Sequence, residues 1–459
     1  MKNLTLNNIV TACGGVFHGD TALLGQCVKS ITTDSRQAEP GCLFVPIAGT
    51  RADGHDYIGQ VMEKGALCTL SEKELPGSEF SYIQVKSSLQ SVKDIAEFYL
   101  TQLCIPVVGI SGSVGKTSTK EMISAVLAQK YRVLKTQGNF NNELGLPLTV
   151  FRIREEDEIA VLEMGISDFG EMSRLARIAK PDTCVLTNIG WCHLENLKTR
   201  DGIMKAKTEM FEFMKPDGHV VLNGDDDKLT QIREVSGHAP VFFGIERTDG
   251  VYADEIENCG LNGVNCRIHL DDKLSFLVRI PMPGVHMVYN ALAAACVGRI
   301  YGLTAEEIKK GIESMETLSG RFHIIETKDY TIIDDCYNAN PVSMKASLEV
   351  LQQGLGRKVA VLGDMGELGE EEAALHEQVG TFAGQCDIQL LICAGPLSGH
   401  LAKAAAGQNK ELEVVHFADL KTLRETLPRL IKKGDTLLIK ASHFMQFDKI
   451  VKQLCDSDR

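Results

Sequence analysis

A glycine-rich loop near residue 115 carries the clearest chemistry in this sequence. An apolar run at 106–110 precedes the loop, and a helical pattern of apolar residues follows it. Glycines let backbone N–H groups turn toward phosphate oxygens, and the N-terminus of the following helix adds positive potential. Lys116 would reach the terminal phosphates of a nucleotide, and the Thr117 hydroxyl would hold Mg²⁺. We expect the whole loop to bind phosphate, namely Gly112, Ser113, Val114, Gly115, Lys116, Thr117 and Ser118.

One position departs from the commonest phosphate-loop pattern, which has glycine where this chain has Ile110. The shorter form, in which Ser-Gly is followed by two variable residues and Gly-Lys-Thr, belongs to a narrower set of ATPases. A glycine turn followed by a surface lysine is the alternative interpretation. The strand pattern before the loop and the helical pattern after it favour the phosphate site.

Composition limits the classes of function that this chain can have. Its 459 residues are 44% hydrophobic and 24% charged, which is typical of a soluble chain with several domains. A net charge of −13 argues against binding to a nucleic-acid backbone, but not against a nucleotide in a local pocket. The 14 cysteines include no Cys-x-x-Cys pair, so we expect buried, reduced thiols and a cytoplasmic location. No apolar stretch is long enough to cross a bilayer, and no membrane partner is expected.

Three regions must position the loop, and together they predict an α/β protein of three domains. Residues 1–103 carry short strand patterns and end in a helical pattern at 89–103. In residues 104–316, buried strand patterns, among them 159–162 and 183–186, alternate with helices, which predicts a parallel sheet. The pattern at 251–280 predicts antiparallel strands. Residues 317–459 repeat the strand–helix alternation, so we expect a smaller Rossmann-like unit.

Polar residues follow several of the predicted strands of the central region. In open α/β sheets, ligands bind beyond the carboxyl ends of the strands. We therefore expect these residues to share one rim with the glycine loop. Mg²⁺ prefers oxygen ligands, so by chemistry alone Glu163 is a better candidate than His193, and an exposed loop carboxylate or a satisfied loop histidine is the alternative. The residues at the rim are Glu163, Asn188, His193, Asp225 and Asp226.

Seven stretches taken together resemble the Mur ligase family of ATP-dependent amino acid and peptide ligases. Five of them are 112–118, 138–149, 163–165, 187–190 with His193, and 206–211. Two more, 334–341 and 362–369 with His376 beyond, resemble the branch of the family that adds D-alanyl-D-alanine. Near the N-terminus, 33–36, 41–45 and 53–55 are similar to the UDP-sugar-binding domain of that branch.

This resemblance implies a specific reaction. ATP would phosphorylate the terminal carboxylate of UDP-N-acetylmuramoyl-tripeptide, and the amine of D-alanyl-D-alanine would attack the acyl phosphate. The products would be UDP-N-acetylmuramoyl-pentapeptide, ADP and phosphate, in peptidoglycan precursor synthesis by a monomer. A sibling ligase that adds a single amino acid, or a folylpolyglutamate synthase, is the rival enzyme; a non-catalytic nucleotide-binding protein and a GTP switch are rivals of other classes.

The resemblance also implies roles for single residues. Two Mg²⁺ ions are expected, and Lys207 matches a lysine that the family carbamylates, although by sequence alone it would be a surface helix residue. The implied catalytic residues are Lys116, Glu163, His193 and Lys207. The implied metal ligands are Thr117, Glu163, His193 and Lys207. Besides the loop, the implied ATP contacts are Asn290, Arg321 and Asp335.

Substrate contacts implied by the resemblance lie in all three regions. For Asn338 and Asn340, which precede Pro341, a role in a turn and helix cap is the alternative. The chain departs from the family at Met287, where asparagine is usual, and at 440–443, where histidine replaces the usual arginine and removes a permanent charge. The expected substrate contacts are Ser35, Arg36, Arg51, His55, Asn139, Asn141, Asn142, Asn338 and Asn340.

Overall fold

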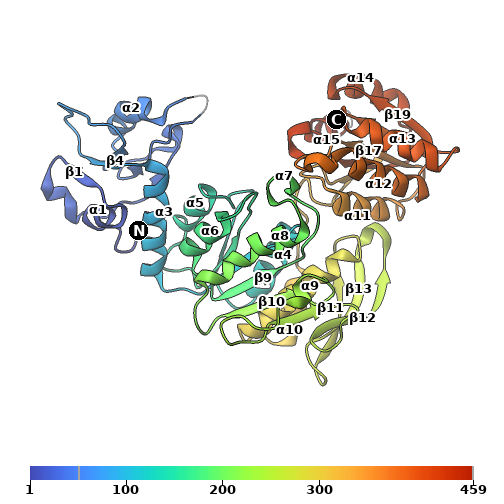
Figure 1. Cartoon of the computed structure of the whole chain (residues 1–459), viewed down its shortest axis with the longest axis horizontal. Coiled ribbons are helices and arrows are strands. Elements are labelled where there is room, and N and C mark those ends of the chain that lie inside the picture. The colour runs from blue at the N-terminus through green and yellow to red at the C-terminus, as the bar shows by residue number, and fades with distance from the viewer. Residues whose placement is uncertain (50–51, 457–459) are drawn as a thin grey trace.

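The computed structural model describes residues 1–49 and 52–456, which form three domains, each built on its own sheet. Figure 1 shows the N-terminal domain at one end, the C-terminal domain at the other and the central domain between them. This confirms the predicted α/β class with three domains. The proposed limits 1–103, 104–316 and 317–459 stay predictions.

The N-terminal domain has a five-stranded sheet in the order β1-β5-β4-β3-β2, parallel except for the β1–β5 pair. Its strands are β1 (Val16–His18), β2 (Ile31–Thr32), β3 (Leu43–Phe44), β4 (Cys68–Ser71) and β5 (Tyr82–Gln84). Its helices are α1 (Leu6–Cys13), α2 (Ile58–Glu63) and α3 (Ser88–Leu103).

Helix α3 ties this domain to the next. The Ser87 hydroxyl caps it by accepting a hydrogen bond from the backbone N–H of Gln90. Its buried side chains pack against α1 on one side and against the central domain on the other, where the Tyr99 hydroxyl donates to the Ile153 carbonyl at 2.6 Å. The predicted helix at 89–103 is therefore present, and it belongs to the core of both domains.

The central domain has a nine-stranded sheet in the order β14-β13-β12-β11-β10-β9-β6-β8-β7. It is parallel from β7 to β12, and β12 to β14 form the antiparallel extension that was predicted at 251–280. The strands are β6 (Val107–Ser111), β7 (Val133–Lys135), β8 (Ile159–Glu163), β9 (Thr183–Leu186), β10 (His219–Asn223), β11 (Val241–Gly244), β12 (Val251–Asn258), β13 (Val264–His269) and β14 (Ser275–Ile280). The helices are α4 (Lys116–Leu127), α5 (Gly145–Val150), α6 (Glu171–Ala179), α7 (Leu194–Leu197), α8 (Arg200–Thr208), α9 (His286–Ile300) and α10 (Ala305–Glu313).

The C-terminal domain has a six-stranded sheet in the order β15-β16-β20-β17-β18-β19, parallel except for the β15–β16 hairpin. The strands are β15 (His323–Glu326), β16 (Tyr330–Asp334), β17 (Lys358–Gly363), β18 (Leu390–Ala394), β19 (Glu413–Phe417) and β20 (Asp435–Lys440). The helices are α11 (Pro341–Leu351), α12 (Glu372–Gln385), α13 (Ser398–Gln408), α14 (Leu420–Leu430) and α15 (Asp448–Asp456).

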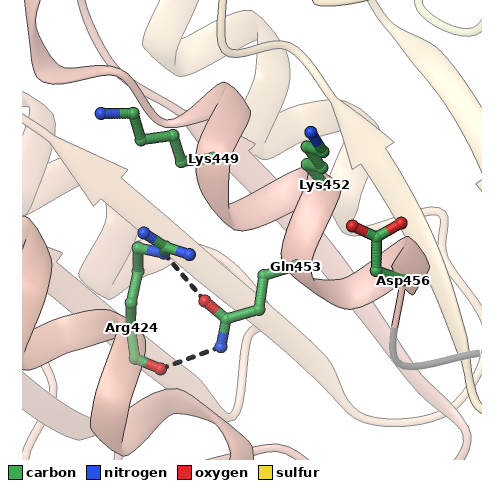
Figure 2. Close-up of a pocket in the computed structure, with 5 residues that line it drawn as sticks. All are labelled: Arg424, Lys449, Lys452, Gln453 and Asp456. Atoms are coloured by element: carbon green, nitrogen blue, oxygen red, sulfur yellow. Dashed lines mark hydrogen bonds between the residues drawn. The ribbon is translucent and has the colours of Figure 1, made fainter.

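Helices α14 and α15 are joined by a reciprocal pair of hydrogen bonds. The Arg424 Nε donates to Gln453 Oε1 at 2.8 Å, and Gln453 Nε2 donates to the Arg424 carbonyl at 3.0 Å (Figure 2). A hollow of about 540 Å³ lies here, and Lys449, Lys452 and Asp456 complete its lining. None of these residues belongs to the cleft between the domains that is described below.

The structure corrects one expectation about the cysteines. No disulfide joins cysteines in the described part of the chain, but Cys27 and Cys104 are exposed rather than buried. Among the described residues, no helix is both long enough and apolar enough to cross a membrane.

Candidate active site

A cleft of about 740 Å³ lies between the central and C-terminal domains. The rim residues Glu163, Asn188, His193, Asp225 and Asp226 all line it, as their positions after parallel strands predicted. Most of the other expected site residues line the same cleft, namely Ser113, Val114, Gly115, Lys116, Thr117, Ser118, Asn139, Asn141, Asn142, Asn290, Arg321, Asp335, Asn338 and Asn340.

The glycine loop connects β6 to α4, and its backbone requires glycine. Gly112 has φ +148°, and a Cβ there would lie 1.9 Å from the Thr187 hydroxyl oxygen. Gly115 has φ +82° and forms the N-terminal end of α4. The Lys116 ammonium folds back and donates to the Gly112 carbonyl at 2.8 Å. The loop is therefore held in a curled form by contacts that no larger residue at position 112 would allow.

The segment after β9 clamps the glycine loop. The Asn188 side-chain oxygen accepts from the Val114 N–H at 2.9 Å, and the Thr187 hydroxyl donates to the Val114 carbonyl at 2.6 Å. The Ser113 hydroxyl both accepts from the Gly190 N–H and lies 3.1 Å from the Gly190 carbonyl. Asn188 thus has a visible structural role in shaping the phosphate loop.

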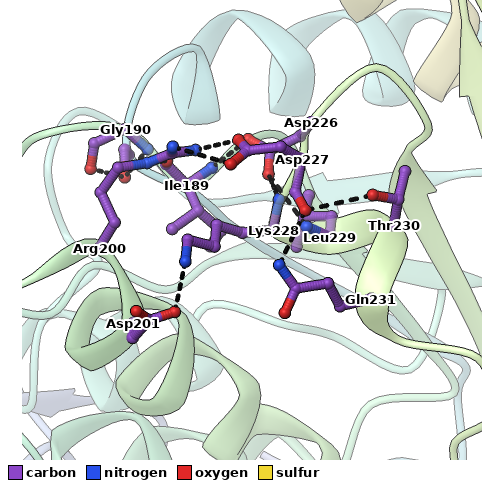
Figure 3. A network of polar contacts seen from close by, with 11 residues as sticks. Ile189, Gly190, Arg200, Asp201, Asp226, Asp227, Lys228, Leu229, Thr230 and Gln231 are labelled. Atoms are coloured by element: carbon purple, nitrogen blue, oxygen red, sulfur yellow. Dashed lines mark hydrogen bonds and ion pairs between the residues drawn. The ribbon is translucent and has the colours of Figure 1, made fainter.

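A second layer of polar contacts fixes that clamp in turn (Figure 3). Asp226 accepts from the Ile189 N–H at 2.7 Å, and Arg200 donates to the Ile189 carbonyl at 2.8 Å. The Arg200 guanidinium also pairs with both oxygens of Asp227. A planar guanidinium in a two-oxygen pair has its orientation fixed as well as its charge matched. The network therefore holds the 189–190 backbone against the glycine loop.

Glu163 is buried, and each of its carboxylate oxygens has a partner. Oε2 accepts from the Thr117 hydroxyl at 2.9 Å, and Oε1 accepts from the Asn141 amide at 2.8 Å. The Lys120 ammonium, itself buried, lies 3.9 Å from Oε2 and 2.9 Å from Glu121 Oε1. Side chains from α4 and from the loop at Asn141 thus orient one carboxylate beside the phosphate loop.

Lys207 is fully buried on α8, and its Nζ has no hydrogen-bond partner among the described residues. Burial, with a smaller contribution from the nearby Lys116 charge, lowers the pKa of this ammonium to about 8. An unpaired buried cation is costly, so the neutral amine is favoured far more than at the surface. The prediction of a surface helix lysine from sequence alone is wrong.

His193 meets a residue of the C-terminal domain. Its Nδ1 lies 2.6 Å from Glu367 Oε2, an ion pair when the imidazole is protonated. The ring nitrogen is buried without an aligned hydrogen-bond partner in the described part of the chain. The neighbouring imidazole and the Lys116 charge lower the pKa of the Glu367 carboxyl. Glu367 therefore lies beside His193 and close enough to Lys116 to feel its charge.

The residues expected to contact ATP are held in place by protein contacts. Asn290 accepts from the Thr119 hydroxyl at 2.9 Å, which places it against the helix of the glycine loop. Asp335 is buried and pairs with the Lys440 ammonium at 2.5 Å. The Arg321 guanidinium lies 4.0 Å from the centroid of the Tyr337 ring, within cation–π range.

Asn340 caps α11, which is the alternative role that the sequence left open. Its side-chain oxygen accepts from the Ser343 N–H, and the Ser343 hydroxyl accepts from the Asn340 N–H, which completes a capping box. Asn338 is exposed, and its side-chain oxygen accepts from the backbone N–H of Ala339. The Asn142 side-chain oxygen accepts from the N–H groups of Leu144 and Gly145, at the start of α5. Contacts of all three with substrate stay predictions.

The expected contacts in the N-terminal domain lie outside the cleft. Arg36 is exposed and pairs with Asp34, whose carboxyl pKa falls to about 2 because of hydrogen bonds from Arg36. His55 Nδ1 lies 2.7 Å from Asp53 Oδ1. The Ser35 carbonyl accepts from a lysine of α2's C-terminal end. Arg51 falls outside the described residues.

Several residues of the site were not expected from the sequence. Lys120 looked like one more helix lysine, and only its burial distinguishes it. Arg200 and Trp191 also line the cleft. Trp191 is the single tryptophan of the chain and lies between the 187–190 motif and His193, so its position in the sequence could have indicated a place in the site. His443, where the sequence predicted a departure from the family, lies beside the Tyr337 ring, with ring centroids 5.5 Å apart.

Three family models match this chain in succession. They are "Mur ligase family, catalytic domain" over residues 28–107, "Mur ligase middle domain" over 110–298, and "Mur ligase, glutamate ligase domain" over 320–443. Together they cover most of the chain, including the glycine loop and the C-terminal half of the cleft.

Relatives match over nearly the full length. A UDP-N-acetylmuramoyl-tripeptide–D-alanyl-D-alanine ligase of Bacillus subtilis (strain 168) is 36% identical over 435 residues, 94% of each chain. The ligase of the same name from Escherichia coli (strain K12) is 32% identical over 99% of each chain. A crystal structure of MurF from Acinetobacter baumannii is 32% identical with a TM-score of 0.90, covering 98% of both chains. MurF ligase from Thermotoga maritima in complex with ADP has a TM-score of 0.83 at 31% identity, covering 94% of this chain and 97% of that one. This chain belongs to the Mur ligase family.

Proposed function

We propose that this protein joins D-alanyl-D-alanine to the terminal carboxylate of UDP-N-acetylmuramoyl-tripeptide at the expense of ATP. The reaction proceeds through an acyl phosphate and gives UDP-N-acetylmuramoyl-pentapeptide, ADP and phosphate. It supplies a precursor of peptidoglycan. The observation that carries this conclusion is similarity above 30% identity along nearly the whole chain to ligases with this one activity.

The rival enzymes have weaker support. A UDP-N-acetylmuramoyl-L-alanyl-D-glutamate–2,6-diaminopimelate ligase and a folylpolyglutamate synthase match at 15% and 14% identity, which shows a shared fold alone. A nucleotide-binding protein without activity would not need Glu163 and Lys207 buried together with the phosphate loop. The ligase that adds D-alanyl-D-alanine is therefore the function we propose.

The chain's own charges suit the first chemical step. Phosphoryl transfer to a carboxylate brings two anions together, so neutralising charge is the main requirement. Lys116 and the N–H groups of the glycine loop supply positive charge from the central domain. Arg321 supplies it from the C-terminal domain, across the same cleft. A cleft formed by two domains can also keep water away from a reactive acyl phosphate.

Mg²⁺ fits the buried polar atoms of this site. Thr117 and Glu163 provide oxygen ligands, His193 lines the cleft beside them, and Lys207 has a buried nitrogen without a hydrogen-bond partner among the described residues. We infer that these four residues hold two Mg²⁺ ions. Bound Mg²⁺ would neutralise negative charge on the ATP phosphates during transfer of the terminal phosphoryl group.

Carbamylation would explain why Lys207 is buried alone. The neutral amine nitrogen attacks the carbon of dissolved CO₂, a C–N bond forms, and one proton leaves to solvent. The product is a carbamate anion, which replaces a costly buried cation by an oxygen ligand for a metal. The lowered pKa supports this step because only the neutral amine can react.

We infer the substrate contacts from the positions of the predicted residues. Asn139, Asn141, Asn142, Asn338 and Asn340 line the cleft and can both donate to and accept from peptide groups. Ser35, Arg36 and His55, with Arg51 outside the described residues, are proposed to bind the UDP-sugar. We also propose that the protein is a monomer and lies in the cytoplasm.

Choice of acceptor tests this proposal. Purified protein would be incubated with ATP, Mg²⁺ and UDP-N-acetylmuramoyl-tripeptide, and with D-alanyl-D-alanine, free diaminopimelate, lysine or glutamate in parallel. Mass spectrometry of the UDP product should show addition of the dipeptide alone. A product carrying a single amino acid would overturn the assignment in favour of a sibling ligase.

A further inference from the structure

Two non-glycine residues with left-handed backbone meet where the central and C-terminal domains touch. His193, in the central domain, has φ +50°, and Glu367, in the C-terminal domain, has φ +62°. This conformation is disfavoured for residues other than glycine. Strained residues of this kind gather at functional sites, where the surrounding structure holds them. Both residues of this contact have strained backbone, which suggests that the contact has a functional role.

Glu367 reaches the central domain from a segment that docks on it. The segment follows β17 and leads through residues 364–368 into a short 3₁₀ turn, Gly369–Glu371. Gly369 lies against Glu195 of α7, so close that a Cβ at Gly369 would be 3.3 Å from the Glu195 Cα. The position of α7 beside the C-terminal domain is visible in Figure 1. The backbone contact thus delivers the Glu367 carboxylate to His193.

We propose that Glu367 is a positioning residue for His193, through which the C-terminal domain completes the metal site of the central domain. This inference rests on the proposed metal role of His193. A histidine that holds a metal commonly has its other ring nitrogen against a carboxylate, which sets the tautomer and the direction of the ring. Here the carboxylate lies 2.6 Å from Nδ1 and leaves Nε2 available.

The arrangement couples two events that would otherwise be independent. Glu367 can hold His193 only while the two domains are together, because each residue comes from a different domain. Metal binding and domain approach must then favour one another by the same free energy. The site would be complete only when the C-terminal domain, with its part of the peptide cleft, is in place.

Manganese binding provides a readout other than turnover. Free Mn²⁺ would be measured by electron paramagnetic resonance in the full chain, with a non-hydrolysable ATP analogue present. Replacing a carboxylate that supports a metal-bound histidine typically lowers the affinity for the metal by about 10–100-fold. We expect at least a tenfold rise in the Mn²⁺ dissociation constant for Glu367→Ala. Glu370→Ala, a matched exposed acid three residues along, should leave it unchanged.

A double-mutant cycle separates positioning from direct metal binding. If Glu367 acts through His193, Glu367→Ala should have no further effect on Mn²⁺ affinity in a His193→Ala background. Additive losses, or an unchanged affinity in the single Glu367→Ala variant, would overturn the inference alone. If His193→Ala binds Mn²⁺ as tightly as the parent, the proposed metal role of His193 falls and this inference falls with it. Thermal melting of Glu367→Ala close to that of the parent would confirm that the fold is intact.

Discussion

Lys207 gives the sharpest prediction at the level of a single atom. Its amine is buried on α8 without a partner among the described residues, and its pKa falls from 10.5 to about 8. At pH 7 about one-tenth of such amines are neutral, against about 0.03% for an ordinary lysine, a gain of about 300-fold. Because only the neutral amine reacts with CO₂, burial alone makes Lys207 a far better target for carbamylation than surface lysines.

Replacing Lys207 with alanine removes the group that would carry the carbamate. We expect ligation, followed as ADP release, to fall by about 10²–10³-fold, the usual cost of losing one group that stabilises charge in a transition state. Short carboxylic acids such as acetate should restore part of the activity, because they can place oxygen atoms in the vacated space. Lys205→Ala, on the exposed face of the same helix, is the matched control and should keep its activity.

The same reasoning fixes a dependence on pH. Below the pKa of about 8, the neutral fraction of Lys207 rises about tenfold for each pH unit, so activation by added bicarbonate should grow between pH 6 and pH 8 and then level off. After incubation with ¹³C-bicarbonate, a ¹³C NMR signal from the lysine carbamate should appear in the parent and be absent from Lys207→Ala. An alanine variant that is fully active without any added acid would refute the role of Lys207.

Three further predictions concern the loop and the cap. Lys116→Ala should abolish ligation while calorimetry shows UDP-tripeptide affinity within a few fold of the parent; complete loss of that affinity would contradict the separation of the two binding domains. Gly112→Ala should lower nucleotide affinity or fail to fold normally, because its Cβ would lie 1.9 Å from the Thr187 hydroxyl; thermal shift with ADP checks this. Asn340→Ala should lose about 1 kcal/mol of unfolding free energy as its cap is lost, whereas Asn338→Ala should leave the melting temperature unchanged. Both variants should raise a substrate KM, and a normal KM in both would contradict their proposed contacts with substrate.

Much of the central domain could be predicted from local patterns. The buried strand runs and the glycine loop are set by residues close in sequence, so 159–162 and 183–186 became β8 and β9 almost at the predicted limits. The position of Glu163 in the cleft follows from the same logic, because parallel strands end at one edge of a sheet. Shorter or less apolar strands, such as β7, β11 and β19, were not predicted.

Residues whose roles depend on distant partners could not be predicted. The buried Lys120 ammonium donates to the Thr136 carbonyl and pairs with the adjacent Glu121. The helix pattern of α4 does not reveal the contact with Thr136. The contact between His193 and Glu367 depends on how two domains meet. The opposite holds for Asn340, because the Asn-Pro signal for a helix cap is local and was visible in the sequence.

The central claim is that the acceptor of this ligase is D-alanyl-D-alanine. The most direct test is ADP release from ATP in the presence of UDP-N-acetylmuramoyl-tripeptide and Mg²⁺, measured with and without the dipeptide. We predict sustained ADP release only when D-alanyl-D-alanine is present, with one ADP formed for each pentapeptide. Equal ADP release without the dipeptide, or release supported by a free amino acid in its place, would contradict the account.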